Sequence, residues 1–432
     1  MGPSERMAPL LFFETRPMSR LSTLVAGVLL IPIGLFARNN DLGYVQTNLV
    51  ANKADFHPQI IDENMVNAWG IALRPPGAGG HIWISNAVTG SSSEFIGDVP
   101  GNPLHQDGLK LVRLDMPGFT DHGHAYVTGQ AYNSASDIAG QPVEFPVAGP
   151  ADNDKVTPPE PIPAGYSGSA KFVFVTEDGC INAWSANTAI AMRVAPIIIN
   201  YSKTAPSMPS RVNCVFTGVA LSNNAFNSEA FAKAGGNHVY AADIRNNVIR
   251  VFDNKWKDVT DAFRFQTPAS VGQLHPANLI DVDGKLFVAY AQFDEESDEG
   301  QEQVLGAGLG HVVEYNEDGT LVKDFTDHGL LNNPWGMAVA PASFGLFAND
   351  LLVANFGDGT ITAFDLKTGD FAGYLRDADT KIIAIDGIWG LAFGNGVSLG
   401  DADALYFTAG PHGEDDGLFG RLTVHSGSIV RH

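Results

Sequence analysis

Histidine and aspartate recur together in this chain in a pattern that suits metal binding. The sequence Phe-Thr-Asp-His-Gly occurs at 119–123 and again at 325–329, and another histidine precedes a proline at 275–276. Neutral imidazole is the commonest transition-metal ligand, and a neighbouring carboxylate can orient the ring. The candidate metal ligands or bases are therefore Asp121, His122, His275, Asp327 and His328.

The same repeated sequence also suits a simple loop turn. In that alternative the aspartate accepts backbone N–H bonds and the glycine adopts a positive φ. The close spacing expected of two ligands on one segment occurs only at His122 and His124, and two ligands do not complete a site. Both interpretations stay open at the level of sequence.

Two further segments, 293–302 and 410–417, concentrate carboxylates. Hard cations such as Ca²⁺ bind carboxylate and carbonyl oxygens, so either segment could hold one, although neither has the EF-hand spacing. A solvated run of charge is the alternative. The candidate residues are Asp294, Glu295, Glu296, Asp298, Glu414, Asp415 and Asp416. The sequence leaves open whether a bound ion would be calcium or a transition metal.

A repeated Trp-Gly phrase indicates the elements that position these residues. It occurs at 67–72, 333–338 and 387–392, and each copy precedes a strand-turn-strand pattern. Such repeats predict an all-β, six-bladed β-propeller over 44–424, closed by a strand at 44–50. We interpret the tryptophan as packing between blades and the glycine as allowing inner strands to approach closely.

Propeller topology brings two kinds of loop to one face: the links into inner strands and the turns after second strands. The histidine-bearing links and the acidic segments are therefore expected around the mouth of the central channel. Cys180 and Cys214 fall on this face too, which predicts a disulfide, with two small core residues as the alternative. The Pro-, Gly- and Ser-rich stretch 130–168 is expected to form a surface insertion.

The terminal segments predict an exported protein. Residues 1–37 end in an apolar run after Arg20 that resembles a secretory signal, with an uncleaved membrane anchor as the alternative. Residues 425–432 form a short tail. The net charge of −22 argues against nucleic acid or an anionic membrane surface as partner. We expect a secreted or periplasmic monomer without a membrane span after signal cleavage.

The stretches 44–50, 170–179, 352–359 and 405–410 resemble a family of conserved hypothetical exported proteins, NHL-like six-bladed β-propellers that in bacteria often carry PEP-CTERM sorting signals. The resemblance implies a propeller outside the cytoplasm and supplies no catalytic residues. This chain differs from the pattern in lacking a carboxy-terminal Pro-Glu-Pro signal. It also has two cysteines and the long insertion.

Two functions follow from these observations, beside a third possibility, a purely structural surface protein whose acidic residues serve solubility alone. One is a binding or interaction propeller that holds a small molecule, glycan or protein over the channel mouth. The alternative is a metal-dependent hydrolase or lyase with a divalent ion at the mouth. The chain lacks the Gly-x-Ser-x-Gly and His-Glu-x-x-His motifs, but propeller active sites are assembled from scattered loop residues. The sequence therefore leaves open whether the protein is an enzyme.

Overall fold

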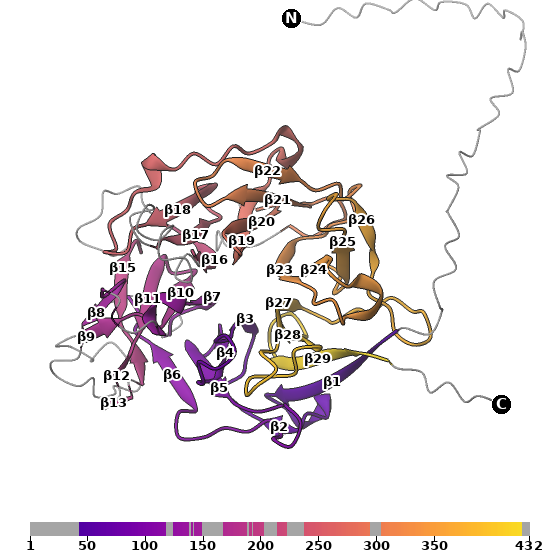
Figure 1. The fold of residues 1–432 in the computed structure, drawn as a ribbon, viewed down its shortest axis with the longest axis horizontal. Coiled ribbons are helices and arrows are strands. Elements are labelled where there is room, and N and C mark those ends of the chain that lie inside the picture. The colour runs from indigo at the N-terminus through magenta and orange to yellow at the C-terminus, as the bar shows by residue number, and fades with distance from the viewer. Residues whose placement is uncertain are drawn as a thin grey trace, which may run out of the picture. The chain divides into compact units, whose positions relative to one another are not determined.

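Six antiparallel sheets follow one another around a common centre in the computed structural model of this chain (Figure 1). The structure describes residues 43–117, 124–137, 140, 142–148, 167–187, 190–191, 193–202, 214–222, 237–293 and 304–425. The innermost strands β3, β7, β16, β19, β23 and β27 lie nearest the centre. This arrangement confirms the predicted all-β, six-bladed propeller.

The first three blades alternate short buried strands with tight turns. Blade one contains β3 (Ala68–Ala72), β4 (Ile82–Asn86), β5 (Ser91–Phe95) and β6 (Leu111–Leu114), with β14 (Val194–Ala195) at its edge. Blade two contains β7 (Val127–Tyr132), β10 (Phe172–Thr176), β11 (Cys180–Trp184) and β15 (Ile197–Asn200). Blade three contains β16 (Phe216–Leu221), β17 (Val239–Asp243) and β18 (Val248–Phe252).

The other three blades are each built on four antiparallel strands. Blade four contains β19 (His275–Val282), β20 (Lys285–Ala291), β21 (Gly310–Asn316) and β22 (Leu321–Asp324). Blade five contains β23 (Pro334–Val339), β24 (Leu351–Asn355), β25 (Ile361–Phe364) and β26 (Phe371–Tyr374). Blade six contains β27 (Ile388–Phe393), β28 (Leu405–Ala409), β29 (Leu418–Val424) and β1 (Tyr44–Ala51).

Strand β1 closes the ring as predicted. It pairs antiparallel with β29, in a register that runs from Tyr44 opposite Val424 to Ala51 opposite Leu418. The short strand β2 (Ile60–Ile61) then adds to β1 in parallel. Blade six therefore combines the first and last described strands of the chain. The first blade in the sequence is consequently held against the last, without a gap in the ring.

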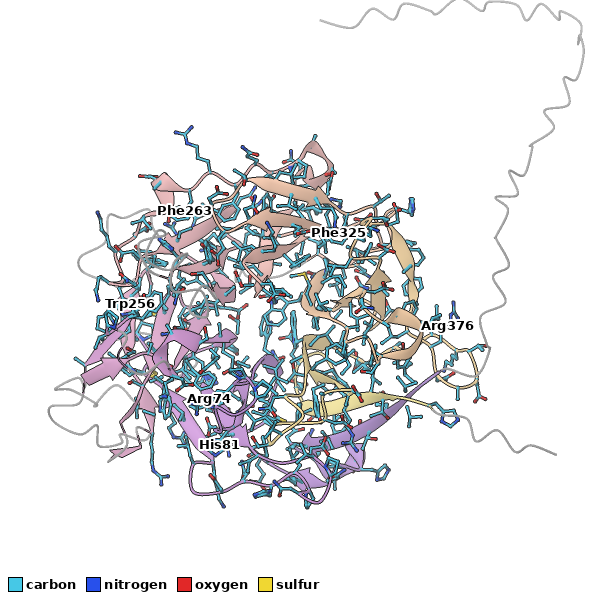
Figure 2. The ribbon with its side chains drawn as sticks, in the orientation of Figure 1. Arg74, His81, Trp256, Phe263, Phe325 and Arg376 are labelled. Atoms are coloured by element: carbon cyan, nitrogen blue, oxygen red, sulfur yellow. The ribbon has the colours of Figure 1, made fainter. Side chains whose placement is uncertain are left out.

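The described part of the long insertion packs on blade three. Within it, β8 (Pro146–Ala148) pairs antiparallel with β9 (Ser167–Ser169). Outside it, β12 (Ala186–Asn187) pairs antiparallel with β13 (Ile190–Ala191). The Nε1 of Trp256, at the periphery in Figure 2, donates to the carbonyl of Pro146 over 3.0 Å. The predicted boundary at residue 130 falls inside β7, because the alternation of this inner strand continues to Tyr132.

Among the described residues, the helices are short 3-10 turns in the connections. They span Ala54–Phe56, Ser134–Asp137, Thr260–Ala262, Ala269–Val271 and Gly345–Phe347. Within the described ranges, no helix is both long enough and apolar enough to cross a membrane.

All six inner strands carry a β-bulge at the same place. In each blade, the inner strand contains one residue more than the second strand between two successive paired positions. In blade five, for example, the three-residue step from Pro334 to Met337 lies opposite the two-residue step from Asn355 to Val353. A bulge bends a strand and re-aims the side chain that it contains. The residue pairs at the six bulges are Trp69–Gly70, Thr128–Gly129, Thr217–Gly218, Ala277–Asn278, Trp335–Gly336 and Trp389–Gly390.

Five of the six bulges contain glycine because the neighbouring backbones leave no room for a Cβ atom. A Cβ on Gly336 would lie 2.1 Å from the carbonyl oxygen of Trp389, and one on Gly70 would lie 2.6 Å from that of Thr128. Blade four has Asn278 instead, whose Nδ2 donates to the Trp335 carbonyl over 2.9 Å. The predicted close approach of inner strands is confirmed.

We predict that Gly336→Ala destabilises the propeller by about 3 kcal/mol or more, since the added Cβ meets backbone that cannot rotate away. Gly108→Ala is the matched control, because a Cβ there meets nothing within 4 Å. It should leave stability unchanged or raise it by roughly 0.5 kcal/mol. Urea unfolding of both variants measures the difference. Equal stabilities would show that the inner strands can move apart.

Candidate functional site at the channel mouth

We call the face where inner strands begin and second strands end the mouth. An aromatic plug, defined as Trp69, Trp335, Trp389 and Phe356, closes the channel there. The Trp389 ring stacks between those of Trp69 and Phe356, with both centroid separations at 3.9 Å. The Trp335 ring meets Trp389 edge-on at 5.9 Å. The three tryptophans are buried, so they form a floor beneath the mouth loops.

The plug is asymmetric around the axis. Blades five, six and one contribute the tryptophans, whereas blades two, three and four place Thr128, Thr217 and Ala277 at the same position. The small residues leave room for the indoles, and Trp335 Nε1 donates across the channel to the Thr217 carbonyl over 3.0 Å. The predicted packing role is therefore confirmed, but the rings meet one another at the axis instead of separating adjacent blades.

A small cavity lies among the inner strands next to the plug. It has a volume of about 50 Å³ and is lined by residues of all six inner strands, including Gln130 and Asn278. That volume holds a few water molecules. Gln130 and Asn278 use their amide N–H groups on the backbone carbonyls of Gly70 and Trp335. The amides that line this cavity are therefore occupied by the backbone of the inner strands.

A chain of hydrogen bonds connects the plug to the acidic turn of blade six. Trp389 Nε1 donates to Asn67 Oδ1 over 2.9 Å, and Asn67 Nδ2 donates to Glu414 Oε2 over 2.5 Å. Burial raises the pKa of Glu414 to about 7, against the lowering effect of the Asn67 hydrogen bond. The Glu414 backbone also has a φ of 71°. A half-buried carboxyl in a strained conformation, with a pKa near neutrality, is typical of functional sites.

Asparagine in the Trp-Gly phrase serves a backbone requirement that sequence reasoning missed. The residues two positions before the tryptophans are Asn67, Asn333 and Gly387, with φ values of 48°, 52° and 64°. Each carbonyl accepts a hydrogen bond from the first residue after its own second strand. Asparagine and glycine tolerate this left-handed conformation best. The repeated Asn-x-Trp-Gly spacing is the sequence pattern that could have predicted this left-handed position.

Asp416 connects the acidic turn of blade six to the segment after β1 through hydrogen bonds and an ion pair. Its Oδ1 contacts Lys53 Nζ at 2.5 Å and Asn52 Nδ2 at 2.9 Å, and its Oδ2 contacts His412 Nδ1 at 2.8 Å. Burial would raise the pKa of Asp416, but these hydrogen bonds outweigh it and hold the pKa at about 2. The neighbouring Asp415 is exposed. Of the predicted acidic residues, Glu414 thus faces the plug and Asp416 is structural.

The predicted histidine cluster is only partly described, and its described members contact different partners. His275 Nδ1 lies 2.5 Å from the Ile244 carbonyl, and its ring stacks on Phe293. Asp327 Oδ1 accepts the Gly329 N–H over 2.6 Å, and His328 is exposed. This is the geometry of the loop-turn interpretation.

The remaining candidates, Asp121, His122, Asp294, Glu295, Glu296 and Asp298, lie outside the described residues. Among the residues that are described, no group of three or more His, Cys, Asp or Glu side chains is arranged to hold a metal ion. The divalent-ion site stays a prediction.

His311 is the histidine that Asp327 contacts, and sequence reasoning did not select it. Its Nδ1 lies 2.7 Å from Asp327 Oδ2 and its Nε2 lies 2.6 Å from Asp324 Oδ1. Burial lowers the pKa of His311, but the two carboxylates outweigh this effect and raise it. The imidazolium can donate to both carboxylates at once. His311 therefore ties β21 to the link that enters blade five.

The predicted disulfide between Cys180 and Cys214 is absent from the structure, where both are buried free thiols. Cys180 Sγ faces Asn200 of its own blade at 3.8 Å, whereas Cys214 Sγ faces Asn246 of blade three at 3.9 Å. Their placement on one face was therefore insufficient to pair them. Burial raises the pKa of the Cys214 thiol, which disfavours the reactive thiolate.

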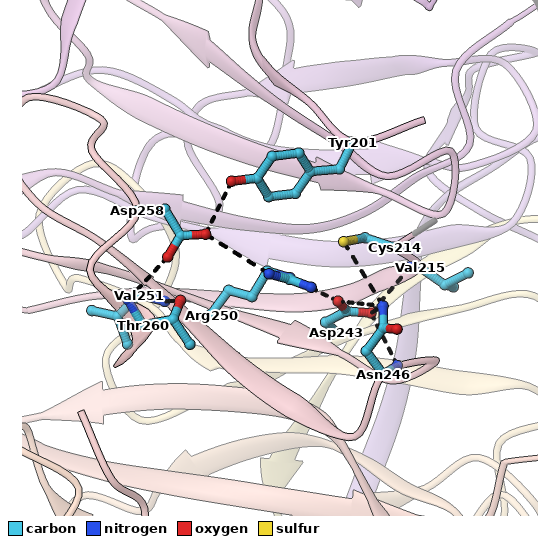
Figure 3. A network of polar contacts seen from close by, with 9 residues as sticks. All are labelled: Tyr201, Cys214, Val215, Asp243, Asn246, Arg250, Val251, Asp258 and Thr260. Atoms are coloured by element: carbon cyan, nitrogen blue, oxygen red, sulfur yellow. Dashed lines mark hydrogen bonds and ion pairs between the residues drawn. The ribbon is translucent and has the colours of Figure 1, made fainter. Parts of the chain in front are cut away.

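Figure 3 shows the polar network that surrounds Cys214. The fully buried Asp243 accepts a hydrogen bond from Arg250 Nε over 2.8 Å and also bonds Asn246. Arg250 continues to Asp258 at 3.7 Å and lies over the Tyr201 ring at 5.3 Å. Each charge in this network has a partner, so we assign the network a structural role at the seam of blades two and three.

Comparisons with known proteins agree with the fold and do not assign an activity to this chain. No family model matches this chain. It is 28% identical over 371 residues to an uncharacterised protein of Acanthamoeba polyphaga mimivirus, covering 84% of this chain and 76% of that protein. A second uncharacterised protein of that virus is 31% identical over 214 residues, covering 48% and 51% of the two chains. This chain thus spans about half of the second relative.

Solved structures with a similar arrangement are distant. One is a protein of unknown function from Bacteroides thetaiotaomicron, with 13% identity, 84% and 70% coverage and a TM-score of 0.45. Another is a virginiamycin B lyase from Staphylococcus aureus, with 12% identity, 88% and 99% coverage and a TM-score of 0.43. At these values the likeness carries no functional argument, and the fold assignment rests on the sheet topology.

We predict that Asp416→Asn lowers the free energy of unfolding at pH 7 by roughly 1–3 kcal/mol, because buried hydrogen bonds to a charged group are lost. The folded pKa lies below the ordinary 3.8, so this stabilisation is present above pH 3.8 and is lost as the pH falls through about 2. Urea unfolding between pH 2 and 7 measures it. The exposed neighbour supplies the control: Asp415→Asn should match the wild type, and equal losses in both variants would contradict the assignment.

Proposed function

We propose that this chain is an extracytoplasmic ligand-binding propeller whose site is the mouth around Glu414. The observation that carries the proposal is the Glu414 carboxyl, with a pKa of about 7, joined through Asn67 to the aromatic plug. A group that exchanges its proton near neutral pH can accept or donate a hydrogen bond to a ligand. The plug below it excludes water and fixes the Asn67 amide.

The extracytoplasmic location is supported by sequence alone. The apolar run before residue 37 follows Arg20 and has the length of a signal core. The family resemblance points the same way. Retention of the apolar run as an anchor is the alternative. Amino-terminal sequencing of the exported protein distinguishes the two.

We predict that tryptophan fluorescence titrates with a midpoint of about pH 7, because ionisation of Glu414 changes the hydrogen bonding of Asn67 and hence of Trp389. Glu414→Gln should abolish this transition, whereas Asp261→Asn, a change at an exposed carboxylate in a 3-10 helix, should preserve it. A midpoint unchanged in Glu414→Gln would remove the basis for placing the site there.

The same residue predicts a pH dependence of stability. The folded pKa of Glu414 lies above its ordinary value of 4.5, so between pH 4.5 and about 7 the folded protein binds more protons than the unfolded chain. This group therefore costs stability as the pH rises through that window. Glu414→Gln should gain stability relative to the wild type from pH 5 to pH 8 in urea unfolding. A constant difference across that range would contradict the raised pKa.

Ligand identity is approached by thermal-shift screening of the wild type and Glu414→Gln with small lactones, glycans and divalent metals. Binding to the folded state alone raises the melting temperature in proportion to the logarithm of ligand concentration. A ligand of the mouth should stabilise the wild type more than Glu414→Gln. Ligands that stabilise both proteins equally bind elsewhere.

A metal-dependent hydrolase or lyase is the second candidate, because a carboxyl with a pKa near 7 suits general acid–base catalysis. In this alternative Asp121, His122, His275, Asp327 and His328 supply ligands or bases. A divalent ion, when bound, would polarise a carbonyl or activate water. The decisive variant is the double substitution His122→Ala and His328→Ala. Loss of bound metal together with activity would support the enzyme, and unchanged metal content would eliminate this ligand set.

A further inference from the structure

Three hydrogen-bond donors meet on the face opposite the mouth, at the seam of blades one and two. Arg74 (Figure 2) follows β3, Tyr132 ends β7 and Lys171 precedes β10, so all three lie where inner strands end and second strands begin. We call these three residues the donor cluster. Their polar atoms converge on the carboxylate of Asp137, the last residue of the 3-10 turn Ser134–Asp137.

The donor cluster surrounds this carboxylate closely. Arg74 Nε and Nη2 lie 3.1 and 2.6 Å from Asp137 Oδ2, which also accepts a hydrogen bond from the Tyr132 hydroxyl. Lys171 Nζ lies 2.5 Å from Asp137 Oδ1. Burial would raise the pKa of Asp137, but the hydrogen bonds from these donors outweigh it and lower the pKa. The donor cluster is therefore arranged to hold an anion.

A single carboxylate does not match the donor cluster in charge or in the number of acceptor atoms. Arg74 and Lys171 carry two positive charges, whereas Asp137 carries one negative charge. Three of the four donor contacts fall on Oδ2, although a carboxylate oxygen has only about two acceptor sites. A phosphate monoester has a charge of about −1.5 to −2 at pH 7 and three strong acceptor oxygens. It would therefore match both the charge and the donors.

The donor cluster is held in place by contacts that do not involve Asp137. The guanidinium carbon of Arg74 lies 5.7 Å from the centroid of the Tyr132 ring, which packs against Phe172 with the two centroids 5.5 Å apart. The backbone N–H of Lys171 donates to a carbonyl of β11 over 2.7 Å. The three donors are thus preorganised for an anion, which reduces the entropic cost of binding one.

Asp137 lies where an external anion can replace it. Its side chain is 21% exposed, and those of Arg74 and Lys171 are 15% and 18% exposed, so solvent reaches the space that the carboxylate fills. The start of the turn is fixed separately, because Asn133 Oδ1 accepts the Ala135 N–H over 3.2 Å. Rotation of the Asp137 side chain can therefore vacate the donor cluster while the turn stays attached to the end of β7.

We propose that the donor cluster is a binding site for a phosphate monoester group, which Asp137 occupies as an internal ligand until the phosphate replaces it. The net charge of −22 repels anions at long range. At physiological ionic strength, however, exposed charges farther away than about 8 Å are largely screened, so the two nearby cations decide the local interaction. The site lies on the opposite face from Glu414. It goes beyond the proposed function, and either proposal can fail without the other.

Isothermal titration of the full chain with inorganic phosphate, at constant ionic strength, tests this site. Asp137→Ala should bind phosphate about tenfold or more tightly than the wild type, because the donor cluster is then open in every molecule. Adding Arg74→Met to Asp137→Ala should abolish the binding. Adding Lys257→Met, a change at an exposed lysine, is the matched control and should preserve it. Acetate, which has a single charge, should bind Asp137→Ala more weakly than phosphate does.

Four results would overturn the proposal. They are no phosphate binding by Asp137→Ala, equal affinity of Asp137→Ala and the wild type, binding that survives Arg74→Met, and acetate binding as tight as that of phosphate. Asp137→Asn keeps the shape of the side chain and removes its charge, so it is the second variant if Asp137→Ala does not fold. It too should bind phosphate more tightly than the wild type, and equal affinity would again overturn the proposal.

Discussion

The shortage of space at the propeller axis is the constraint on which the rest of this structure depends. Six inner strands converge so closely that a Cβ on Gly336 would lie 2.1 Å from a neighbouring carbonyl oxygen. A bulge at each crossing, with glycine in five of the six, relieves the crowding and re-aims the side chain at the bulge. The positions of the three tryptophans, and of the residues that contact them, follow from this geometry.

The repeats share their backbone geometry but differ in side chains, and the candidate site results from that difference. A ring of six identical blades would pair every indole with an asparagine, or none. Here Trp389 and Asn67 form a complete pair that leads to Glu414, whereas Asn333 has no counterpart on blade four. The site proposed around Glu414 thus lies at the seam where this pair is complete.

Much of the fold could be predicted from sequence, because blade strands and Trp-Gly bulges are local patterns. The strand at 44–50 was placed correctly in blade six for the same reason. The site was harder to predict from the sequence, because it depends on contacts between residues that lie far apart in the chain. Asp327 contacts His311 and not its neighbour His328, and Glu414 reaches Asn67 from 347 positions away. The predicted disulfide was wrong for a similar reason, because placement on one face of the propeller does not specify which residue each thiol contacts.

The stacking of Trp69 on Trp389 has a consequence for how the chain folds. These two residues are separated in sequence by nearly the full propeller, and β1 must likewise meet β29 in the outer part of blade six. Closing so long a loop carries a large entropic cost before its contacts form. In an open repeat array, by contrast, neighbouring units can assemble progressively. Ring closure and plug assembly both require the first and last described blades to meet, so a partial set of blades lacks the stacked indoles beneath the mouth.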